Sequence, residues 1–428
     1  MAESLKKVRK AKSAGSLLSA ILDLGKAMIT CGGEIWRVEE TLGMMLETYC
    51  FKEYDILVMS NGLHATAKTW DGRIYTQVRQ LEGTSYDLDK LERLFSLANE
   101  IEEKPLGVDH LKERLYEILE SPGIPLWRGL IGSIIAACGF CVFYGGDLND
   151  VIVAAFTALI VYTLGKHSMK LLHNILTSNT VSAFAMELII LLMVQTGVAH
   201  HPGPITIATM LLFISGLGFT SGFKDLIHGD VLSGIIDSTY SILGATGIAI
   251  GITIAMFVMP GAEIVVQVQP HISGHFLQII SCTVGCIGFA VLFGAKEGKI
   301  FIFSAIGAAI NWLIFLVAYN DSIDGLFAAT LAGAAFVAFY SVVVESLAKI
   351  PATVILTACI FPLIPGSDLY YTVSAAILHN HDLFLTHGRT FILICIGISV
   401  GFIIVDVAQK HMDLFRLKIY KYQRSRQK

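Results

Sequence analysis

Between residues 126 and 408 the sequence is a succession of long apolar runs separated by short polar segments. In lipid, backbone groups must be satisfied within the spanning segment, so runs approaching about 20 residues are predicted to cross as helices. The candidate spans are Leu126–Tyr144, Val151–Gly165, Val181–Val198, Ile205–Phe219, Ile235–Val258, Phe276–Phe293, Ile300–Tyr319, Leu326–Val344, Ala352–Pro365 continuing towards Leu378, and Thr390–Val407. Hydrophobic residues make up 54% of the 428, a membrane composition. We therefore predict an α-helical polytopic membrane protein with about ten transmembrane helices.

Residues 1–125 carry frequent charges and are predicted to form a separate α+β domain. Apolar residues at three- and four-residue spacings predict helices over Leu17–Thr30, Glu34–Tyr49, Leu88–Glu102 and Val108–Leu119. Between the second and third helices the period changes to two, with Asn-Gly and Asp-Gly pairs that favour tight hairpin turns. This pattern predicts a three-stranded antiparallel meander over Tyr54–Ser60, Leu63–Thr69 and Arg73–Arg79.

The charges of the loops predict the orientation in the membrane. With the N-terminus inside, the inner loops contain Lys166, Lys170, Lys224, Lys296, Lys299 and Lys349, and the tail 411–428 is basic. The outer loops contain Asp147, Asp150, Glu263, Asp321, Asp324 and Asp382, with Arg389 as the exception. This alternation follows the positive-inside rule. No secretory signal is evident, so we expect both termini in the cytoplasm and the spans in the plasma membrane.

The ninth run is broken in its middle. Within Ala348–Val373, Pro362, Pro365 and Gly366 interrupt the apolar sequence, and Ser367 and Asp368 follow at once. Proline removes a backbone donor and clashes with the preceding turn, so an uninterrupted helix is not expected. A broken backbone at membrane depth is tolerated where it lines a cavity. A helix restarting after Gly366 would direct free N–H groups into that cavity, which suits a carboxylate.

The ten spans divide into five-helix repeats over 126–260 and 275–410. An odd number of spans in each repeat predicts that equivalent helices run in opposite directions, as in inverted-repeat transporters. The first repeat contains an echo of the break: about fifteen residues separate Pro204 from the glycine-containing stretch Ser215–Gly222, and Asp225 follows. Paired breaks at corresponding positions predict a site near the bilayer midplane.

Polar residues near the two breaks and inside the spans are the candidate substrate and ion pathway. A charge near the bilayer centre costs roughly 2.5–3.5 kcal/mol, so each one needs a partner or a cavity. The candidates are Pro365, Gly366, Ser367, Asp368, Gly218, Thr220, Ser221, Asp225, Asp230, Asp237, Glu187 and Asn311. Asp368 is the first candidate for a carboxylate that carries a coupling proton.

Five of these residues have structural alternatives that the sequence leaves open. Glu187 is ordinary if it lies near the interface. Asp225 and Asp230 also fit a short polar cytoplasmic loop, and Asp237 fits a helix cap as well as a proton or cation site. Asn311 either hydrogen-bonds substrate or bridges two helices.

Other titratable groups are predicted to lie at the surface of the membrane or outside it. Asp406 is expected near the cytoplasmic interface of the last span. The histidines His379, His381 and His387 are expected in an exposed outer loop, where they would titrate near neutral pH. The eight cysteines support neither a disulfide framework nor a metal site, and we expect no cofactor.

In the N-terminal domain, Glu34, Arg37 and Glu40 lie on successive turns of one predicted helix. Their spacing favours a solvated, salt-bridged face, in which each pair contributes a few tenths of a kcal/mol. This is the interpretation from spacing alone.

Several segments together resemble the threonine/serine exporter family, in a fused form of its two-component relatives. They are Gly33-Glu-Ile-Trp-Arg-Val-Glu-Glu-Thr-Leu42, Gly146-Asp147, Asp225-Leu-Ile-His-Gly-Asp230 with Gly234, and Ile350-Pro-Ala-Thr-Val with Pro-Leu-Ile-Pro-Gly366 and Leu-Tyr370. The resemblance implies secondary active export of small amino acids or of dicarboxylates such as succinate. It also implies that the helix with Glu34 and Arg37 is functional or regulatory.

The sequence departs from the family pattern at two places. It has Ser215–Gly222 where relatives have a proline-glycine break, and Asp237 where relatives often carry an arginine. The leading hypothesis is a proton-coupled exporter of threonine-like or serine-like amino acids, with the broken helices binding the substrate carboxylate. The alternatives are a dicarboxylate exporter and a membrane-anchored ligand sensor or scaffold. The sequence shows no nucleophile–base pair, so we do not expect an enzyme. It contains no nucleic-acid motif. Whether the protein forms a homo-oligomer is left open.

Overall fold

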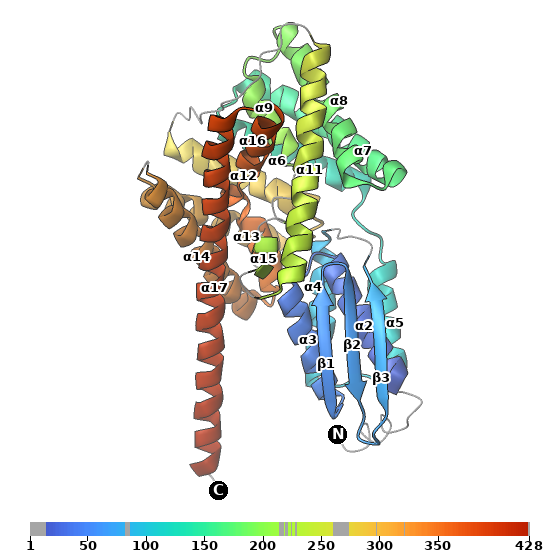
Figure 1. Cartoon of the computed structure of the whole chain (residues 1–428). Helices are drawn as coiled ribbons and strands as arrows, with labels where there is room; N and C mark the ends of the chain where they lie inside the picture. Colours follow the sequence, from blue (N-terminus) through green and yellow to red (C-terminus); the bar gives the residue numbers. More distant parts are fainter. Residues whose placement is uncertain are drawn as a thin grey trace.

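The computed structural model describes residues 14–81, 86–213, 218, 221–223, 225–226, 229–259, 274–296, 298–320 and 322–426. The chain forms a small N-terminal domain beneath a larger helical body (Figure 1). The C-terminal end of the last helix lies on the same side of the body as the N-terminal domain (Figure 1). The N-terminal domain and the end of α17 (His381–Arg426) therefore lie on one side of the helical body, and the assignment of that side to the cytoplasm remains a prediction.

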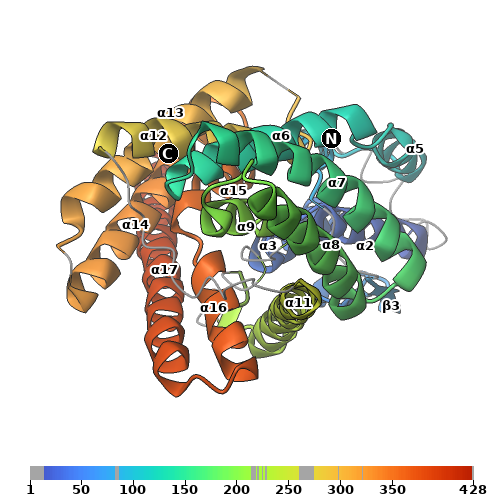
Figure 2. The ribbon, with the colours of Figure 1, turned by 90° about the horizontal axis from the view of Figure 1, so that it is seen from above.

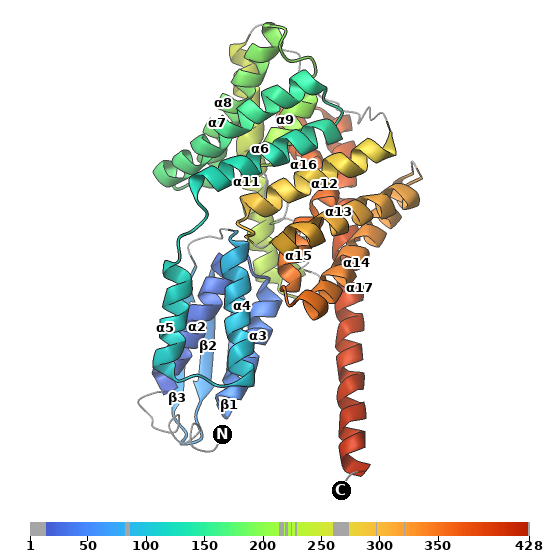
Figure 3. The ribbon, with the colours of Figure 1, turned by 180° about the vertical axis from the view of Figure 1, so that it is seen from behind.

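The N-terminal domain is a three-stranded antiparallel sheet covered on one face by four helices (Figures 1 and 3). The strands are β1 (Glu53–Met59), β2 (Gly62–Lys68) and β3 (Ile74–Gln80), in the order β1-β2-β3. The helices are α2 (Ala14–Thr30), α3 (Ile35–Thr48), α4 (Leu88–Glu103) and α5 (Val108–Glu120). Met59 pairs with Gly62 across the first tight turn, so the predicted meander and α+β class are confirmed.

The helical body contains two sets of helices. The first set is α6 (Leu126–Phe143), α7 (Leu148–Leu172), α8 (Ile175–Gln195), α9 (Pro202–Met210) and α11 (Val231–Val258). The second is α12 (His275–Leu292), α13 (Gly298–Ala318), α14 (Ile323–Ala348), α15 (Ala352–Cys359), the 3₁₀ turn η1 (Phe361–Leu363), α16 (Gly366–Ile377) and α17 (His381–Arg426).

Among the described residues, eight helices are long and apolar enough to cross a membrane, and the bent pair α15 and α16 makes up to nine. The predicted polytopic helical membrane class is thereby confirmed. Of the predicted fourth span, the structure describes little beyond the nine residues of α9, so the tenth span remains a prediction. The last helix is longer than its predicted span, because α17 continues through the basic tail to Arg426.

The two sets pack in a similar way. Helix α8 lies along α11 in the first set, and α14 lies along α17 in the second. These are the third and fifth spans of each set when α15, η1 and α16 are counted as one broken span. The first helices of the two sets, α6 and α12, pack against each other (Figure 2). A Cβ at Gly139 or Gly288 would clash with the backbone of the facing helix, so glycines allow α6 and α12 their close approach. Helices α11 and α17 run in opposite directions (Figure 1).

Candidate functional site

The ninth predicted span is broken where the sequence placed the break. Helices α15 and α16 are bent by 44° at the turn η1. Leu363 N–H donates to the carbonyl of Ile360 in a 3₁₀ turn, at 2.9 Å, instead of to Cys359 one residue earlier. The Cys359 carbonyl is therefore free of its helical partner, and the buried Asn311 amide of α13 donates to it at 3.0 Å. Asn311 thus bridges two helices and stabilises the break, which is the structural alternative noted above.

A cavity of about 930 Å³ lies between the N-terminal domain and both helix sets. The first set contributes Gly218, Ser221, Asp225 and Asp237, with His173 and Asn174 from the end of α7 and its loop. The N-terminal domain contributes Gly33, Glu34, Ser60 and Tyr86. The second set contributes Thr353, Thr357, Ile360, Phe361 and Ile364, so the cavity extends along α15 to the break.

The described cavity lining has an excess of negative charge. Three carboxylates line it, from Glu34, Asp225 and Asp237, and its described residues include no lysine or arginine. Asp225 is only 5% exposed. Asp237 lies inside α11 and lines the cavity together with Ser60 of the N-terminal domain, while Asp230 occupies the N-cap position of α11. The alternative that Asp237 is a helix cap is therefore wrong, because α11 begins at Val231, four residues before the predicted span Ile235–Val258.

Asp368 does not line this cavity. Its carboxylate faces His387 of α17, with 2.9 Å between Oδ1 and Nδ1, and each side chain is 20% exposed. The His387 ring also lies 4.8 Å from the Tyr371 ring. The prediction that His387 sits in an exposed outer loop is wrong, because α17 begins at His381 and carries His387 against α16. His379 and His381 are exposed, as predicted.

Glu187 is buried rather than interfacial, since it is 1% exposed. It accepts a hydrogen bond from Thr206 of α9 at 2.9 Å, and Tyr370 of α16 lies near it. A carboxyl group buried inside the protein calls for a functional or packing role. It lies outside the lining of the large cavity.

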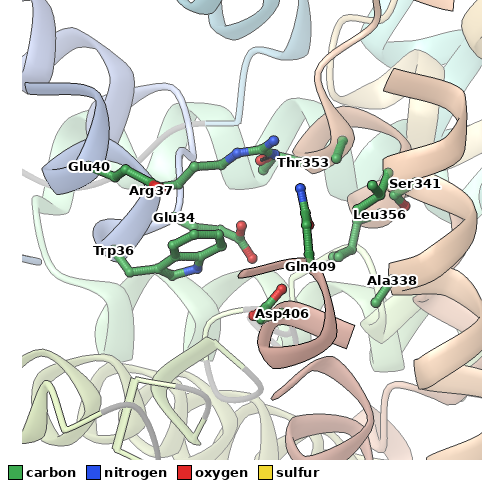
Figure 4. A pocket seen from close by; sticks show the side chains of 12 residues that line it. Glu34, Trp36, Arg37, Glu40, Ala338, Ser341, Thr353, Leu356, Asp406 and Gln409 are labelled. Atoms are coloured by element: carbon green, nitrogen blue, oxygen red, sulfur yellow. Dashed lines mark hydrogen bonds between the residues drawn. The ribbon is translucent and has the colours of Figure 1, made fainter. Parts of the chain in front are cut away.

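A smaller cavity, of about 110 Å³, separates the N-terminal domain from α14, α15 and α17 (Figure 4). Glu34, Arg37 and Glu40 line it, together with Asp406 and Gln409 of α17. Asp406 therefore faces the N-terminal domain, near the end of the predicted last span Thr390–Val407.

Arg37 joins the two parts of the molecule. Its Nη2 donates to both carboxylate oxygens of Glu345 at 2.9 and 2.7 Å, and its Nη1 donates to the Thr353 hydroxyl at 2.9 Å. The guanidinium also lies 5.6 Å from the centre of the Phe95 ring. The interpretation of Arg37 as part of a solvated, salt-bridged helix face is wrong, because its carboxylate partner is on α14. Spacing within one helix cannot reveal a partner 308 residues away.

A second set of contacts fixes the N-terminal domain beside α12. Lys296 Nζ lies 2.6 Å from an Asp89 carboxylate oxygen, and Leu88 N–H donates to the Phe293 carbonyl at 2.8 Å. Tyr86 and Phe293 pack with ring centroids 5.0 Å apart. The domain is therefore held at more than one point around the large cavity.

Comparison with known proteins assigns the chain to one family. The family model described as "Putative threonine/serine exporter" matches residues 19–259, and the model "Threonine/Serine exporter, ThrE" matches residues 278–408. The chain belongs to the threonine/serine exporter family. It is 23% identical over 379 residues to the "Probable threonine/serine exporter" of Mycobacterium tuberculosis (strain ATCC 25618 / H37Rv), covering 84% of this chain and 70% of that relative. No solved structure matches.

In this exporter-family chain, the structure brings only some of the predicted pathway residues together. Gly218, Ser221, Asp225 and Asp237 share the large cavity with Glu34. Thr220 lies outside the described residues. The predicted pathway residues that do not line the cavity are Pro365, Gly366, Ser367, Asp368, Asp230, Glu187 and Asn311.

The sequence reasoning missed cavity residues of two kinds. Thr353 and Thr357 are polar residues four positions apart in the ninth span, so their common helix face was a usable signal. Ser60 and Tyr86 belong to the N-terminal domain, and no local pattern indicates that they reach the membrane helices.

Proposed function

We propose that this protein is a secondary active exporter of small amino acids with the polarity of threonine or serine. The observation that carries the proposal is the cavity between the two helix sets, which contains carboxylates and ends at a helix break. Its large volume leaves space for an amino acid and water. Membership of the threonine/serine exporter family supports transport in the direction of export.

The substrate ammonium group binds the acids of the first helix set. Asp225 and Asp237 offer oxygen atoms to a cation, and the described lining offers no lysine or arginine to a second substrate carboxylate. A dicarboxylate such as succinate brings two negative charges into this lining, so like-charge repulsion disfavours it. Hydroxyls of Thr353 and Thr357 on the opposite wall suit the polar side chain of threonine or serine.

The coupling proton uses a different acid from the substrate. Ile364 is the last residue of the break that lines the cavity, and Asp368 follows one helical turn later, beyond the break. With the predicted orientation, the cavity opens on the inner side and the Asp368–His387 pair lies towards the outer side. A proton arriving from outside therefore meets Asp368 while the substrate waits inside, which is the geometry that a proton antiporter needs.

The two helix sets act as inverted repeats that alternate around the cavity. The opposite directions of α11 and α17 and the shared packing of third helix on fifth support this arrangement. In the other state the break of the second set and its α16 N-terminus would face the substrate, where free N–H groups of the new helix bind its carboxylate.

The N-terminal domain is the inner gate. It supplies part of the cavity wall through Gly33, Glu34, Ser60 and Tyr86, and Arg37 fastens it to Glu345. A gate in this position must detach or tilt before a substrate of this size enters from the inside. The segment with Glu34, Arg37 and Glu40 is then the regulatory element implied by the family resemblance.

The gate has its own test. Arg37→Ala and Glu345→Gln should each speed hydrogen exchange in α3, and the double variant should exchange no faster than Arg37→Ala alone. Arg114→Ala is the matched control, because Arg114 pairs with Glu100 inside the N-terminal domain. Unchanged exchange in Arg37→Ala would show that the ion pair does not hold the domain in place.

Transport assays in proteoliposomes test the function itself. Vesicles loaded with unlabelled threonine should accumulate labelled threonine or serine by exchange, and vesicles loaded with succinate should not accumulate labelled succinate. A scaffold or sensor would exchange neither. Exchange of succinate without exchange of threonine would replace the proposed substrate with a dicarboxylate.

A further inference from the structure

Two loops meet at the end of α6 that is remote from the N-terminal domain. Asp147 is the N-cap of α7 and Asp150 lies in its first turn, while His200 and His201 stand directly before α9. Their side chains form two pairs, Asp147 with His200 and Asp150 with His201. The predicted orientation places this group of two carboxylates and two imidazoles on the outer side. Neither the proposed substrate cavity nor the proton pair uses it.

Asp150 is held rigidly at the centre of this group. Its side chain is 0% exposed, and its Oδ1 accepts the backbone N–H groups of His200 at 2.8 Å and His201 at 3.0 Å. Its Oδ2 accepts the Asp147 N–H at 3.0 Å and lies 2.8 Å from His201 Nδ1. A buried carboxylate that accepts this many hydrogen bonds is held in one position.

The other members of the group face solvent. The His201 side chain is 58% exposed and that of Asp147 is 40% exposed. One ligand atom from each of Asp147, Asp150 and His201 lies within 4.8 Å of the others. Bonds of about 2.0–2.2 Å to a common ion require ligand atoms about 3.4 Å apart, so movement of the two exposed side chains by about 1 Å closes the site.

We propose that Asp147, Asp150 and His201 bind a divalent transition-metal ion such as Zn²⁺ or Mn²⁺. One imidazole nitrogen and two carboxylate oxygens are a ligand set that these ions accept, and water completes the coordination. Coordination through His201 Nδ1 requires the tautomer in which the ring proton is on Nε2, so that Nδ1 offers its lone pair to the ion. His200, hydrogen-bonded to Asp147, orients that carboxylate from outside the ligand set.

The ion would link the N-terminus of α7 to that of α9. Helix α9 begins the fourth predicted span, whose later residues Gly218 and Ser221 line the cavity. A bound ion would therefore hold the outer end of this span against the α6–α7 loop. This consequence for transport rests on the proposed function, whereas binding of the ion does not.

Calorimetry on the purified full-length chain in detergent tests the binding directly, after treatment with a chelator. Zn²⁺ and Mn²⁺ are titrated separately, and Mg²⁺ serves as the comparison ion. We expect one site for the transition metals, with affinity at least about tenfold weaker in His201→Gln and in Asp147→Asn, since loss of even an outer partner costs about 10–100-fold. Asp150 is left intact because it fixes the loop before α9.

The matched control is His275→Gln, because His275 is an exposed histidine at the start of α12. It should bind the ions as the native chain does. Circular dichroism and size-exclusion elution should be unchanged in every variant used. Equal affinities in the native chain and in His201→Gln, or no binding of either transition metal by the native chain, would overturn the proposal. Neither result would bear on amino-acid exchange, which is measured separately in vesicles.

Discussion

The two helix sets approach the cavity with different chemistry. The first set brings Asp225 and Asp237, together with the small residues Gly218 and Ser221. The second brings Ile360, Phe361 and Ile364, and its break is fixed by Asn311 and by the Phe361 ring stacked on Phe289 at 3.8 Å. The two sets therefore differ in chemistry at the cavity: the first supplies carboxylates, and the second supplies an apolar wall beside the helix break.

The cavity lining also separates two acids that the sequence had placed together among the pathway candidates. Asp368 follows the proline-glycine break directly and was the first candidate for the site, yet its partner is His387 across α16 and α17. Asp237 lines the cavity. In the sequence it stood out because relatives often carry an arginine at this position. The predictions below test this division of labour, beginning with the largest expected effect.

Replacing Asp237 by Asn should reduce threonine exchange by about 30-fold or more, because removing one partner of a desolvated charge pair costs about 2–5 kcal/mol. The assay is counterflow in proteoliposomes with equal amounts of folded protein. Asp324→Asn is the matched control, since Asp324 is an exposed acid in the first turn of α14. Near-normal exchange by Asp237→Asn would remove the first set from the substrate site.

Replacing Asn311 by Ala should lower the free energy of unfolding by about 1–3 kcal/mol, because the buried Cys359 carbonyl then has no donor. Thermal unfolding in detergent measures the change. Asn174→Ala is the comparison, since Asn174 caps α8 at an exposed position, accepting from Leu176 and Thr177 N–H, and typically contributes about 1 kcal/mol. A loss no larger at Asn311 than at Asn174 would mean that the second break does not depend on this amide.

Replacing Asp368 by Asn should abolish the dependence of net export on the pH gradient while exchange at equal pH continues. A gradient of one pH unit is worth about 1.4 kcal/mol, which corresponds to about a tenfold increase in net export by the native protein. In Asp368→Asn, the same gradient should leave net export unchanged. The two rates are measured in the same vesicles with and without an imposed gradient. If Asp368→Asn lost equilibrium exchange to the same degree as net export, Asp368 would belong to the substrate site after all.

The smallest effect concerns Glu39, which connects the N-terminal domain with the first helix set. Burial, and after it the nearby charge of Asp230, raises the pKa of Glu39. A carboxyl group with a raised pKa favours the docked domain when it is protonated, so docking is strongest below the ordinary Glu pKa and weakens as pH rises through the raised value. Hydrogen exchange in α3 should therefore slow on acidification, and Glu39→Gln should remove that part of the pH dependence without changing the exchange of α5.

Much of the fold could be predicted from the sequence because it depends on local patterns. The hairpin pairs Asn61-Gly62 and Asp71-Gly72 specify the meander, and the apolar runs specify the spans. The break at Pro365 and Gly366 follows from proline geometry, since no neighbour is needed to forbid a continuous helix.

The site could be predicted only in part, because it depends on contacts between distant segments. Arg37 pairs with Glu345, Asp237 lines a cavity together with Ser60, and Asp150 accepts hydrogen bonds from the backbone amides of His200 and His201. Periodicity places each of these residues on an element but says nothing of which elements meet. The position of Asp368 after the break was visible in the sequence, whereas its partner His387 on α17 was not.

Direct binding of threonine tests the central claim that the first helix set holds the substrate and the second set the coupling proton. Calorimetry on the detergent-purified protein should find threonine binding in the native chain and in Asp368→Asn, and none in Asp237→Asn over the same concentration range. Binding retained by Asp237→Asn and lost by Asp368→Asn would contradict the account, because it would place the substrate at the proline-glycine break of the second set.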